Sequence, residues 1–282
     1  MPEEPESGPR LEERLQTVRD GFKMMAQVAR PGLAESLKLA REALHTLDTA
    51  VAGGLRRVES PRTVSGLYVV LDPAHCKGRD PIAVATQALE GGATMIQWRD
   101  KERDKGDQLP QLRALRELCS RYLAVLIVND HVDLALIVGA DGVHIGQHDL
   151  PVADVRRIVP AEFIVGCSTN NPDEARQAQE DGASYVAVGR VFPSSTKSNT
   201  REASPETVRR VKDSVSRPVV AIGGITLENV DEIILAGADA AAVITAVCEA
   251  DDVEEAALVF SKRFELAEEK RRRAERQDHP SA

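Results

Sequence analysis

The chain opens with two amphipathic segments. Between residues 11 and 52, apolar side chains recur in two series that each step by four, three, four, three and four positions. Each series places one apolar stripe along a helix, and Pro31 and Gly32 end the first helix and turn the chain. We therefore expect an N-terminal helical hairpin, with residues 1–60 forming the hairpin and its linker. Two helices alone bury too little surface to be stable, so the hairpin should pack on the rest of the chain or on another copy of it.

A different pattern begins at Gly66, where short runs rich in β-branched residues alternate with amphipathic helical segments. Such alternation is typical of repeated βα units around a parallel sheet. Eight runs have this character, at residues 67–71, 94–99, 124–128, 142–145, 163–167, 185–189, 218–222 and 241–245. Eight units close a barrel, and the sequence lacks the early glycine-rich turn of a dinucleotide-binding sheet. The prediction is an α/β fold, a (β/α)8 TIM barrel, with the N-terminal helical hairpin as an extension.

The length agrees with this division, since 282 residues accommodate one barrel of about 250 residues and an appendage. We place the barrel at residues 61–264. Residues 265–282 are mostly charged, and we expect a frayed, solvated tail there.

Composition narrows the possible classes of protein. A net charge of −9 argues against a broad surface for nucleic acid or an anionic membrane, although it allows a small basic pocket for phosphates. The four cysteines lie far apart without zinc-ligand spacing, which favours a reduced, cytoplasmic protein. No apolar run reaches the roughly 18 residues of a membrane span, and residues 1–10 are acidic where a secretory signal is basic and then apolar. We expect neither a nucleic acid nor a membrane as partner.

Polar residues gather where the predicted strands end, which is where barrel enzymes hold their active sites. The segments concerned are Gln97 to Lys101, Asn129 and Asp130, Gln147 to Asp149, Ser168 to Asn170, Phe192 to Lys197, Gly223 and Gly224, and Ile244 and Thr245. Side chains alternate along a strand, so Gln97 and Arg99 share one face while Trp98 points the other way, into the helix layer.

Three of these residues are cations: Arg99, Lys101 and Lys197. A single Arg or Lys at a strand end is more often the partner of a surface ion pair. Three cations at one barrel mouth favour another interpretation, because guanidinium and ammonium groups bind phosphate oxygens and several are needed to stabilise a departing diphosphate. The pattern indicates a diphosphate clamp.

Two carboxylates, Asp130 and Asp149, end neighbouring segments and should lie together at the same mouth. Unpaired, they would repel each other, and Mg²⁺ prefers a few carboxylates together with waters and substrate phosphates. We expect Mg²⁺ as the cofactor, bound by these two residues. The alternative is that Asp130 only caps the following helix.

A second phosphate site is predicted on the other side of the mouth. The loops after the seventh and eighth strands of a barrel commonly bind phosphate through backbone N–H groups. Gly223 and Gly224 follow the seventh predicted strand, and Ile244 and Thr245 end the eighth. The alternative is a glycine turn that only chain geometry requires. Two phosphate sites imply two phosphorylated substrates.

At these residues the chain resembles the thiamine phosphate synthase family from Gly66 to about Val259. The similar strings are Gln97 to Lys101, Asn129-Asp130, Gly142 to Gln147 with Asp149-Leu150-Pro151, Phe192 to Lys197, and Ala221 to Ile225. The resemblance implies that 4-amino-2-methyl-5-hydroxymethylpyrimidine diphosphate is joined to hydroxyethylthiazole phosphate, plain or carboxylated, with release of diphosphate. It also implies that the diphosphate departs before the thiazole nitrogen attacks, which requires charge stabilisation and positioning more than a general base.

The resemblance implies roles by position. Gln97 would hold the aminopyrimidine. The diphosphate would be held by Arg99, Lys101, Asn129, Ser168 and Lys197, of which Arg99, Lys101, Ser168 and Lys197 would be catalytic. Asp130 and Asp149 would bind Mg²⁺. The thiazole phosphate would be received by Ser194, Ser195, Thr196, Gly223, Gly224, Ile244 and Thr245.

Two other functions are compatible with the same fold. A thiazole tautomerase relative shares the barrel and the phosphate site, but it isomerises one substrate and needs no diphosphate clamp. A non-catalytic scaffold would use the hairpin for assembly and the barrel as a ligand sensor. The complete set of charged residues favours the synthase. Separately, the apolar stripes of the hairpin lead us to expect a homo-oligomer.

Overall fold

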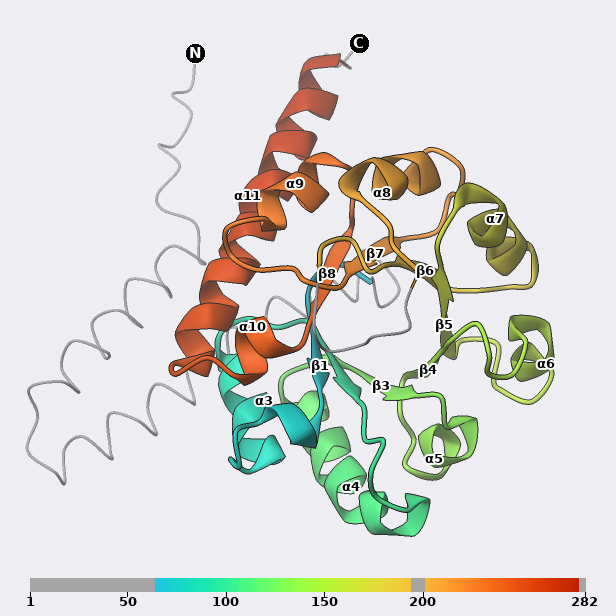
Figure 1. Cartoon of the computed structure of the whole chain (residues 1–282), viewed down its shortest axis with the longest axis vertical. Helices are drawn as coiled ribbons and strands as arrows, with labels where there is room; N and C mark the ends of the chain where they lie inside the picture. The colour runs from blue at the N-terminus through green and yellow to red at the C-terminus, as the bar shows by residue number, and fades with distance from the viewer. Residues whose placement is uncertain (1–63, 194–200, 279–282) are drawn as a thin grey trace, which may run out of the picture. The chain divides into compact units, whose positions relative to one another are not determined.

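The computed structural model of the protein describes residues 64–193 and 201–278, in which eight parallel strands close into a barrel (Figure 1). The strands are β1 (Gly66–Leu71), β2 (Met95–Trp98), β3 (Val125–Asn129), β4 (Gly142–Ile145), β5 (Ile164–Thr169), β6 (Tyr185–Val188), β7 (Val219–Ile222) and β8 (Ala240–Val243). Each strand pairs with the next along the chain, and β8 pairs with β1. The predicted (β/α)8 barrel is confirmed.

Helices surround the strands and form the outer layer of the barrel (Figure 1). They are η1 (Pro73–His75), α3 (Pro81–Glu90), α4 (Lys105–Arg121), α5 (Val132–Ile137), α6 (Val152–Arg156), α7 (Pro172–Glu180), α8 (Pro205–Lys212), α9 (Val230–Leu235), α10 (Thr245–Cys248) and α11 (Val253–Asp278). Several begin as expected from local chemistry: Asp80, Asn171 and Ser204 cap α3, α7 and α8 through their side chains, and a proline follows each cap.

Every predicted strand has a counterpart, and their ends differ by at most two residues. The largest differences concern site residues. Strand β5 continues to Thr169, so Ser168 belongs to the strand and does not follow it. Strand β8 ends at Val243, because Ile244 leaves the extended conformation (φ −114°, ψ −86°) and Thr245 begins α10. Val243, Ile244 and Thr245 are all β-branched, and for this reason the sequence predicted that the strand continues to residue 245.

The barrel interior is filled by side chains from alternate strand positions, as the pleat of a strand requires. The buried interior cluster consists of Val64, Tyr68, Val70, Met95, Val125, Ile127, Ile164, Tyr185, Ala187, Val220, Ala240 and Ala242. The Tyr185 ring is accommodated by Gly166 on β5, where a Cβ atom would lie 2.0 Å from the ring. Trp98 faces outward as predicted, and its indole Nε1 donates a hydrogen bond to Gln108 of α4 over 2.9 Å.

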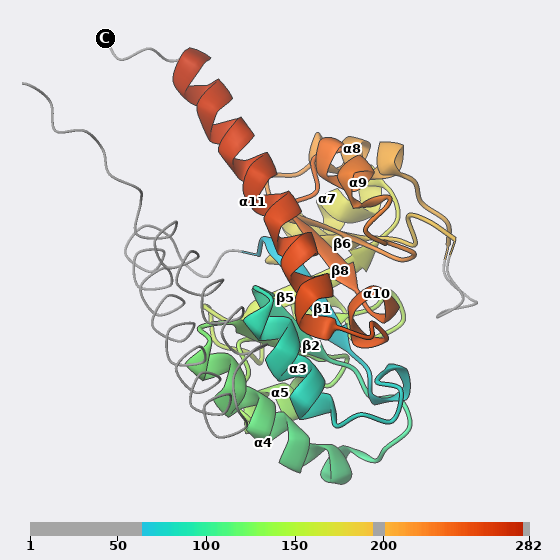
Figure 2. The same cartoon turned by 90° about the vertical axis from the view of Figure 1, so that its left-hand side faces the viewer.

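The charged tail expected after residue 264 is instead part of a helix, because α11 continues to Asp278. Glu, Lys, Arg and Ala dominate this stretch, and these residues favour helix even where nothing covers it. The buried side chains of α11 include Ala257, Phe260 and Phe264, and the helix packs along α3 (Figure 2). A Cβ atom on Gly91, at the end of α3, would lie 2.4 Å from the backbone oxygen of Glu254, so glycine permits this close approach.

The predicted N-terminal hairpin, residues 1–60, lies outside the described residues and stays a prediction. Within the described part of the chain, no helix combines the length and the apolar character needed to cross a membrane.

Candidate active site

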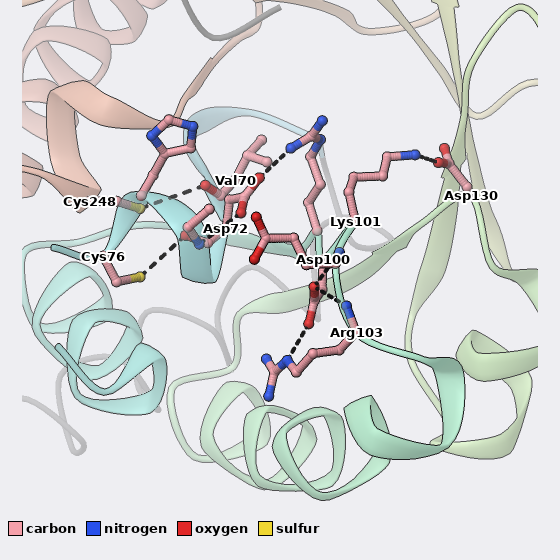
Figure 3. Close-up of polar contacts among 12 residues, drawn as sticks. Val70, Asp72, Cys76, Asp100, Lys101, Arg103, Asp130 and Cys248 are labelled. Atoms are coloured by element: carbon pink, nitrogen blue, oxygen red, sulfur yellow. Dashed lines mark hydrogen bonds and ion pairs between the residues drawn. The ribbon is translucent and has the colours of Figure 1, made fainter. Parts of the chain in front are cut away.

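The first loop of the barrel mouth contributes a carboxylate that the sequence did not single out. Asp72, labelled in Figure 3, directly follows β1 and caps η1 by accepting a hydrogen bond of 3.1 Å from the backbone of Ala74. Its carboxylate also forms an ion pair with Arg99. Only 6% of the Asp72 side chain and 13% of the Arg99 side chain are exposed. The Arg99 Nε is also buried, and it has no hydrogen-bond partner among the described residues. Arg99 is thus held at the mouth by Asp72 while its Nε donor stays unused.

Lys101 and the two predicted metal ligands lie together on the next part of the mouth. Lys101 donates a hydrogen bond to Asp130, as Figure 3 shows, and the carboxyl groups of Asp130 and Asp149 are hydrogen-bonded to each other. Burial acts to raise the pKa of Asp130, but the hydrogen bonds from Lys101 and Asp149 outweigh it and hold this pKa below its ordinary value. Burial and the contact with Asp130 raise the pKa of Asp149. The predicted convergence of the two carboxylates is observed.

Asp130 does not cap the helix that follows it, so that alternative is wrong. The N-cap of α5 is His131, and it makes no side-chain capping hydrogen bond. Asp130 adopts a left-handed backbone conformation (φ 59°), which a non-glycine residue rarely takes without a constraint. The constraint is a hydrogen bond of 2.8 Å from its backbone nitrogen to the carbonyl of His144 on the neighbouring strand. The strained backbone belongs to the carboxylate that contacts both Lys101 and Asp149.

Asp100 organises the loop that carries Lys101. Its carboxylate accepts hydrogen bonds from the backbone of Glu102 (3.0 Å) and Arg103 (3.1 Å) and from Nε of Arg103 (2.5 Å). Burial acts to raise the pKa of Asp100, but these three hydrogen bonds outweigh it and lower the pKa. The Arg103 guanidinium also lies over the Trp98 ring at 5.3 Å. Asp100 and Trp98 are therefore structural supports of the mouth.

The loop after β7 has the glycines that its geometry demands. Gly223 and Gly224 have φ values of 99° and 65°. A Cβ atom on Gly223 would lie 2.5 Å from the Arg190 side chain, and one on Gly224 would lie 2.5 Å from the Pro193 carbonyl oxygen. The backbone of Phe192 donates a hydrogen bond of 3.0 Å to the carbonyl of Gly223. Chain geometry alone therefore accounts for both glycines, and it also brings bare backbone to the mouth.

The remaining predicted site residues fall into two groups. Gln97 and Asn129 are buried, in β2 and at the end of β3, while Ser168 in β5 is partly exposed and Ile244 and Thr245 open α10. Ser194, Ser195, Thr196 and Lys197 lie outside the described residues, so their predicted roles stay predictions.

Sequence reasoning missed a row of polar groups inside the barrel. The side-chain amide of Gln97 donates to Tyr68 (2.6 Å), the hydroxyls of Tyr68 and Tyr185 are 3.0 Å apart, Tyr185 lies 3.0 Å from Nδ1 of His144, and Nε2 of His144 lies 2.9 Å from Ser168 Oγ. The available signal was strand alternation: Tyr68, His144 and Tyr185 are polar or amphipathic residues at inward-facing positions of otherwise apolar strands.

Fold and mouth together define a (β/α)8 barrel enzyme whose C-terminal face carries cations paired with carboxylates. Residues 67–247 match the family model described as thiamine monophosphate synthase. A thiamine-phosphate synthase of Methanospirillum hungatei is 41% identical over 197 residues, which are 70% of this chain and 96% of that protein. The chain belongs to the thiamine-phosphate synthase family.

A solved structure agrees with this assignment. Thiamine phosphate pyrophosphorylase from Pyrococcus furiosus is 38% identical and superimposes with a TM-score of 0.69. The superposition covers 74% of this chain and 99% of that structure. A thiamine-phosphate synthase of Gloeobacter violaceus is 37% identical over 243 residues, 86% of this chain and 68% of that protein. Because only 219 of the 282 residues follow residue 63, this match includes part of the N-terminal region. Similarity to this relative therefore extends beyond the range from Gly66 to about Val259 over which the sequence was seen to resemble the family.

Proposed function

We propose that this chain is a thiamine-phosphate synthase whose reaction takes place at the C-terminal mouth of the barrel. It joins 4-amino-2-methyl-5-hydroxymethylpyrimidine diphosphate to hydroxyethylthiazole phosphate and releases diphosphate, as a step of thiamine biosynthesis. Membership in the family supports the activity. The observation that carries the location is the contact of Lys101, Asp130 and Asp149 beside the buried pair of Arg99 and Asp72.

The diphosphate site would use Arg99, Lys101, Asn129, Ser168 and Lys197, with Gln97 holding the aminopyrimidine. The unused, buried Nε of Arg99 supports this assignment, because a buried donor without a partner is costly unless a ligand satisfies it. As the C–O bond of the pyrimidine methylene breaks, its electron pair leaves with the diphosphate. Donors fixed in advance stabilise that growing negative charge without having to reorient.

The charges at the mouth support a requirement for a divalent cation. Among the described residues named here, two cations, Arg99 and Lys101, face three carboxylates, Asp72, Asp130 and Asp149. Carboxylates at the mouth repel a diphosphate, and a divalent cation between them and the phosphate oxygens would remove this repulsion. Asp130 and Asp149 fit Mg²⁺, since they touch each other, would repel when both are ionised, and leave room in the ligand set for phosphate oxygens. When bound there, Mg²⁺ would neutralise charge on the leaving diphosphate.

The thiazole phosphate would bind at the other side of the mouth, near Ser194, Ser195, Thr196, Gly223, Gly224, Ile244 and Thr245. Backbone N–H groups in the loops after strands seven and eight are the usual phosphate donors of this fold. The position of Gly223 and Gly224 directly after β7 supports this location, because it places backbone N–H groups at the mouth.

One assay separates the three candidate functions: formation of thiamine phosphate from both purified substrates with Mg²⁺. Product formation supports the synthase. Isomerisation of a thiazole phosphate without consumption of the pyrimidine diphosphate would support the tautomerase relative, and binding without turnover would support the scaffold.

The metal gives a sharper prediction. Activity should vanish with EDTA and return with Mg²⁺. Asp149→Asn keeps an oxygen ligand but removes a negative charge, so turnover in excess Mg²⁺ should fall by roughly 100-fold, and Mg²⁺-dependent binding of inorganic diphosphate should weaken in calorimetry. Asp133→Asn is the matched control, since Asp133 is a half-exposed carboxylate on α5 that pairs with Lys105. Full activity in EDTA would contradict the proposed metal site.

We also infer a homo-oligomer formed through residues 1–60 and a cytoplasmic location. The two apolar stripes of the predicted hairpin support the first inference. Four free cysteines, of which Cys76, Cys119 and Cys248 are buried, support a reducing compartment.

A further inference from the structure

Five polar side chains form one continuous row across the barrel, in the order Gln97, Tyr68, Tyr185, His144 and Ser168. Four hydrogen bonds of 2.6, 3.0, 3.0 and 2.9 Å join them. The row begins and ends at residues that the proposed function assigns to the two halves of one substrate, the aminopyrimidine and its diphosphate. The three residues between them have no assigned role.

The surroundings hold this row in place. Tyr68 and Tyr185 belong to the apolar interior cluster, where their rings meet edge to face at 6.2 Å, and the His144 ring stacks on Tyr185 at 5.7 Å. A Cβ atom on Gly166 would lie 2.0 Å from the Tyr185 ring, so the ring occupies space that only a glycine leaves open. Burial raises the pKa of both tyrosines well above the ordinary value. Each phenol therefore keeps its proton and can donate one hydrogen bond.

With the side-chain nitrogen of Gln97 facing Tyr68, one direction along the row gives every proton an acceptor. The amide nitrogen of Gln97 only donates, so Tyr68 accepts from it and gives its own proton to Tyr185. Tyr185 then donates to Nδ1 of His144. In the neutral tautomer that accepts at Nδ1, Nε2 carries the proton and can donate to Ser168, which lies 2.9 Å away.

We propose that this row is a directional hydrogen-bond relay in which Tyr68, Tyr185 and His144 are positioning residues for both ends of the pyrimidine diphosphate. At one end, Ser168 accepts from His144, so its own proton is available to the departing diphosphate. At the other end, the Gln97 side chain directs its nitrogen at Tyr68, so its carbonyl oxygen points away from Tyr68 and is available to accept from the amino group of the pyrimidine. The opposite direction would turn an N–H toward that amino group and direct the Ser168 proton at His144. The inference rests on the proposed diphosphate and pyrimidine sites.

The tautomer of His144 tests the direction in the unmodified protein. Nitrogen NMR of the full chain labelled with ¹⁵N-histidine distinguishes a ring protonated on Nε2 from one protonated on Nδ1. The chain has six histidines, and the His144 signals are assigned by their loss in His144→Gln or, if that variant does not fold, by substituting the other five in turn. Protonation on Nε2 alone is expected. Protonation on Nδ1, or on both nitrogens, overturns the relay.

Calorimetry of inorganic diphosphate with Mg²⁺ tests the consequence for binding. Tyr185→Phe removes the donor to His144 and should weaken binding by about tenfold, the scale of one hydrogen bond to a charged group. In a Ser168→Ala background the same change should have no further effect, because Tyr185 acts only through Ser168. Tyr122→Phe removes the same atom from a tyrosine outside the row and should leave binding unchanged.

These measurements separate failure of the relay from failure of the proposed site. If Tyr185→Phe weakens diphosphate binding equally in the wild-type chain and in the Ser168→Ala variant, the relay is overturned and the proposed site stands. If Ser168→Ala itself leaves diphosphate binding unchanged, the assignment of Ser168 to the diphosphate fails, and with it the proposal that the row serves this substrate.

Discussion

The two described cations of the mouth differ in their surroundings. Arg99 and its partner Asp72 are largely buried, whereas half of the Lys101 side chain is exposed. A buried ion pair is expensive to break, because the remaining partner keeps its desolvation penalty. Residues with the same proposed task should therefore respond differently to the same substitution.

We expect Lys101→Ala to lower kcat by roughly 100-fold, the scale of losing one donor to a developing charge, and to lower stability less than Arg99→Ala, since Lys101 itself is half exposed. Arg99→Ala should lower both kcat and stability, the latter by about 3 kcal/mol, since it strands Asp72. Thermal unfolding and steady-state kinetics measure the two effects. Lys105→Ala is the control, because Lys105 is equally exposed and pairs with Asp133, and neither residue has an assigned role in the reaction. Unchanged turnover in Lys101→Ala would contradict its assignment to the diphosphate.

Strand alternation was sufficient to predict that Gln97 faces the interior and Trp98 the helix layer, since both follow from the local pleat. Alternation does not reveal which side chains meet across the barrel. The pairing of Asp72 with Arg99 and the contact of Tyr68 with Tyr185 depend on register between strands and on empty space above glycines. For this reason the sequence identified most residues at the mouth but not their partners.

Among the elements, β5 shows how one glycine sets the packing of a neighbouring strand. Gly166 lies opposite Tyr185 in the register of β5 and β6, and the tyrosine ring crosses the space above it. This glycine is needed for room and not for an unusual backbone conformation.

Gly166→Ala should therefore lower the free energy of unfolding by about 2 kcal/mol, the usual cost of overpacking a core. Gly106→Ala in α4 is the matched control, since a Cβ atom there meets nothing within 4 Å. That variant should gain up to about 1 kcal/mol from helix propensity. Urea unfolding of both variants makes the comparison, and equal stabilities would show that the Tyr185 ring can move aside.

The identity of the elements was predictable because eight β-branched runs alternate with helical segments, but two element ends were not. The sequence Ala242-Val243-Ile244-Thr245 has high strand propensity throughout, and only the tertiary turn into α10 ends β8. Conversely, charge after residue 264 suggested a tail, while the helix-favouring character of the same residues extends α11.

For the whole molecule, the match to the M. hungatei enzyme covers 96% of that protein but only 70% of this chain. A family member can thus consist of little more than the barrel. Deleting residues 1–60 should accordingly leave turnover near that of the full chain, while light scattering should show a smaller assembly if the hairpin joins subunits. A truncated chain that keeps its assembly size would exclude the hairpin as the interface, and one that loses activity would give the N-terminal region a part in the site.

Pairing of β1 with β8 joins the first strand of the barrel to the last, with Gly66 opposite Ala240. Ribosomes release a chain from its N-terminus at about 5–20 residues per second, so β1 emerges several seconds before its final partner exists. During that interval one edge of β1 exposes unpaired backbone groups, which readily associate with strands of other chains. Closure of the barrel must wait until β8 has been synthesised, and until then the edge of β1 is open to pairing with other chains.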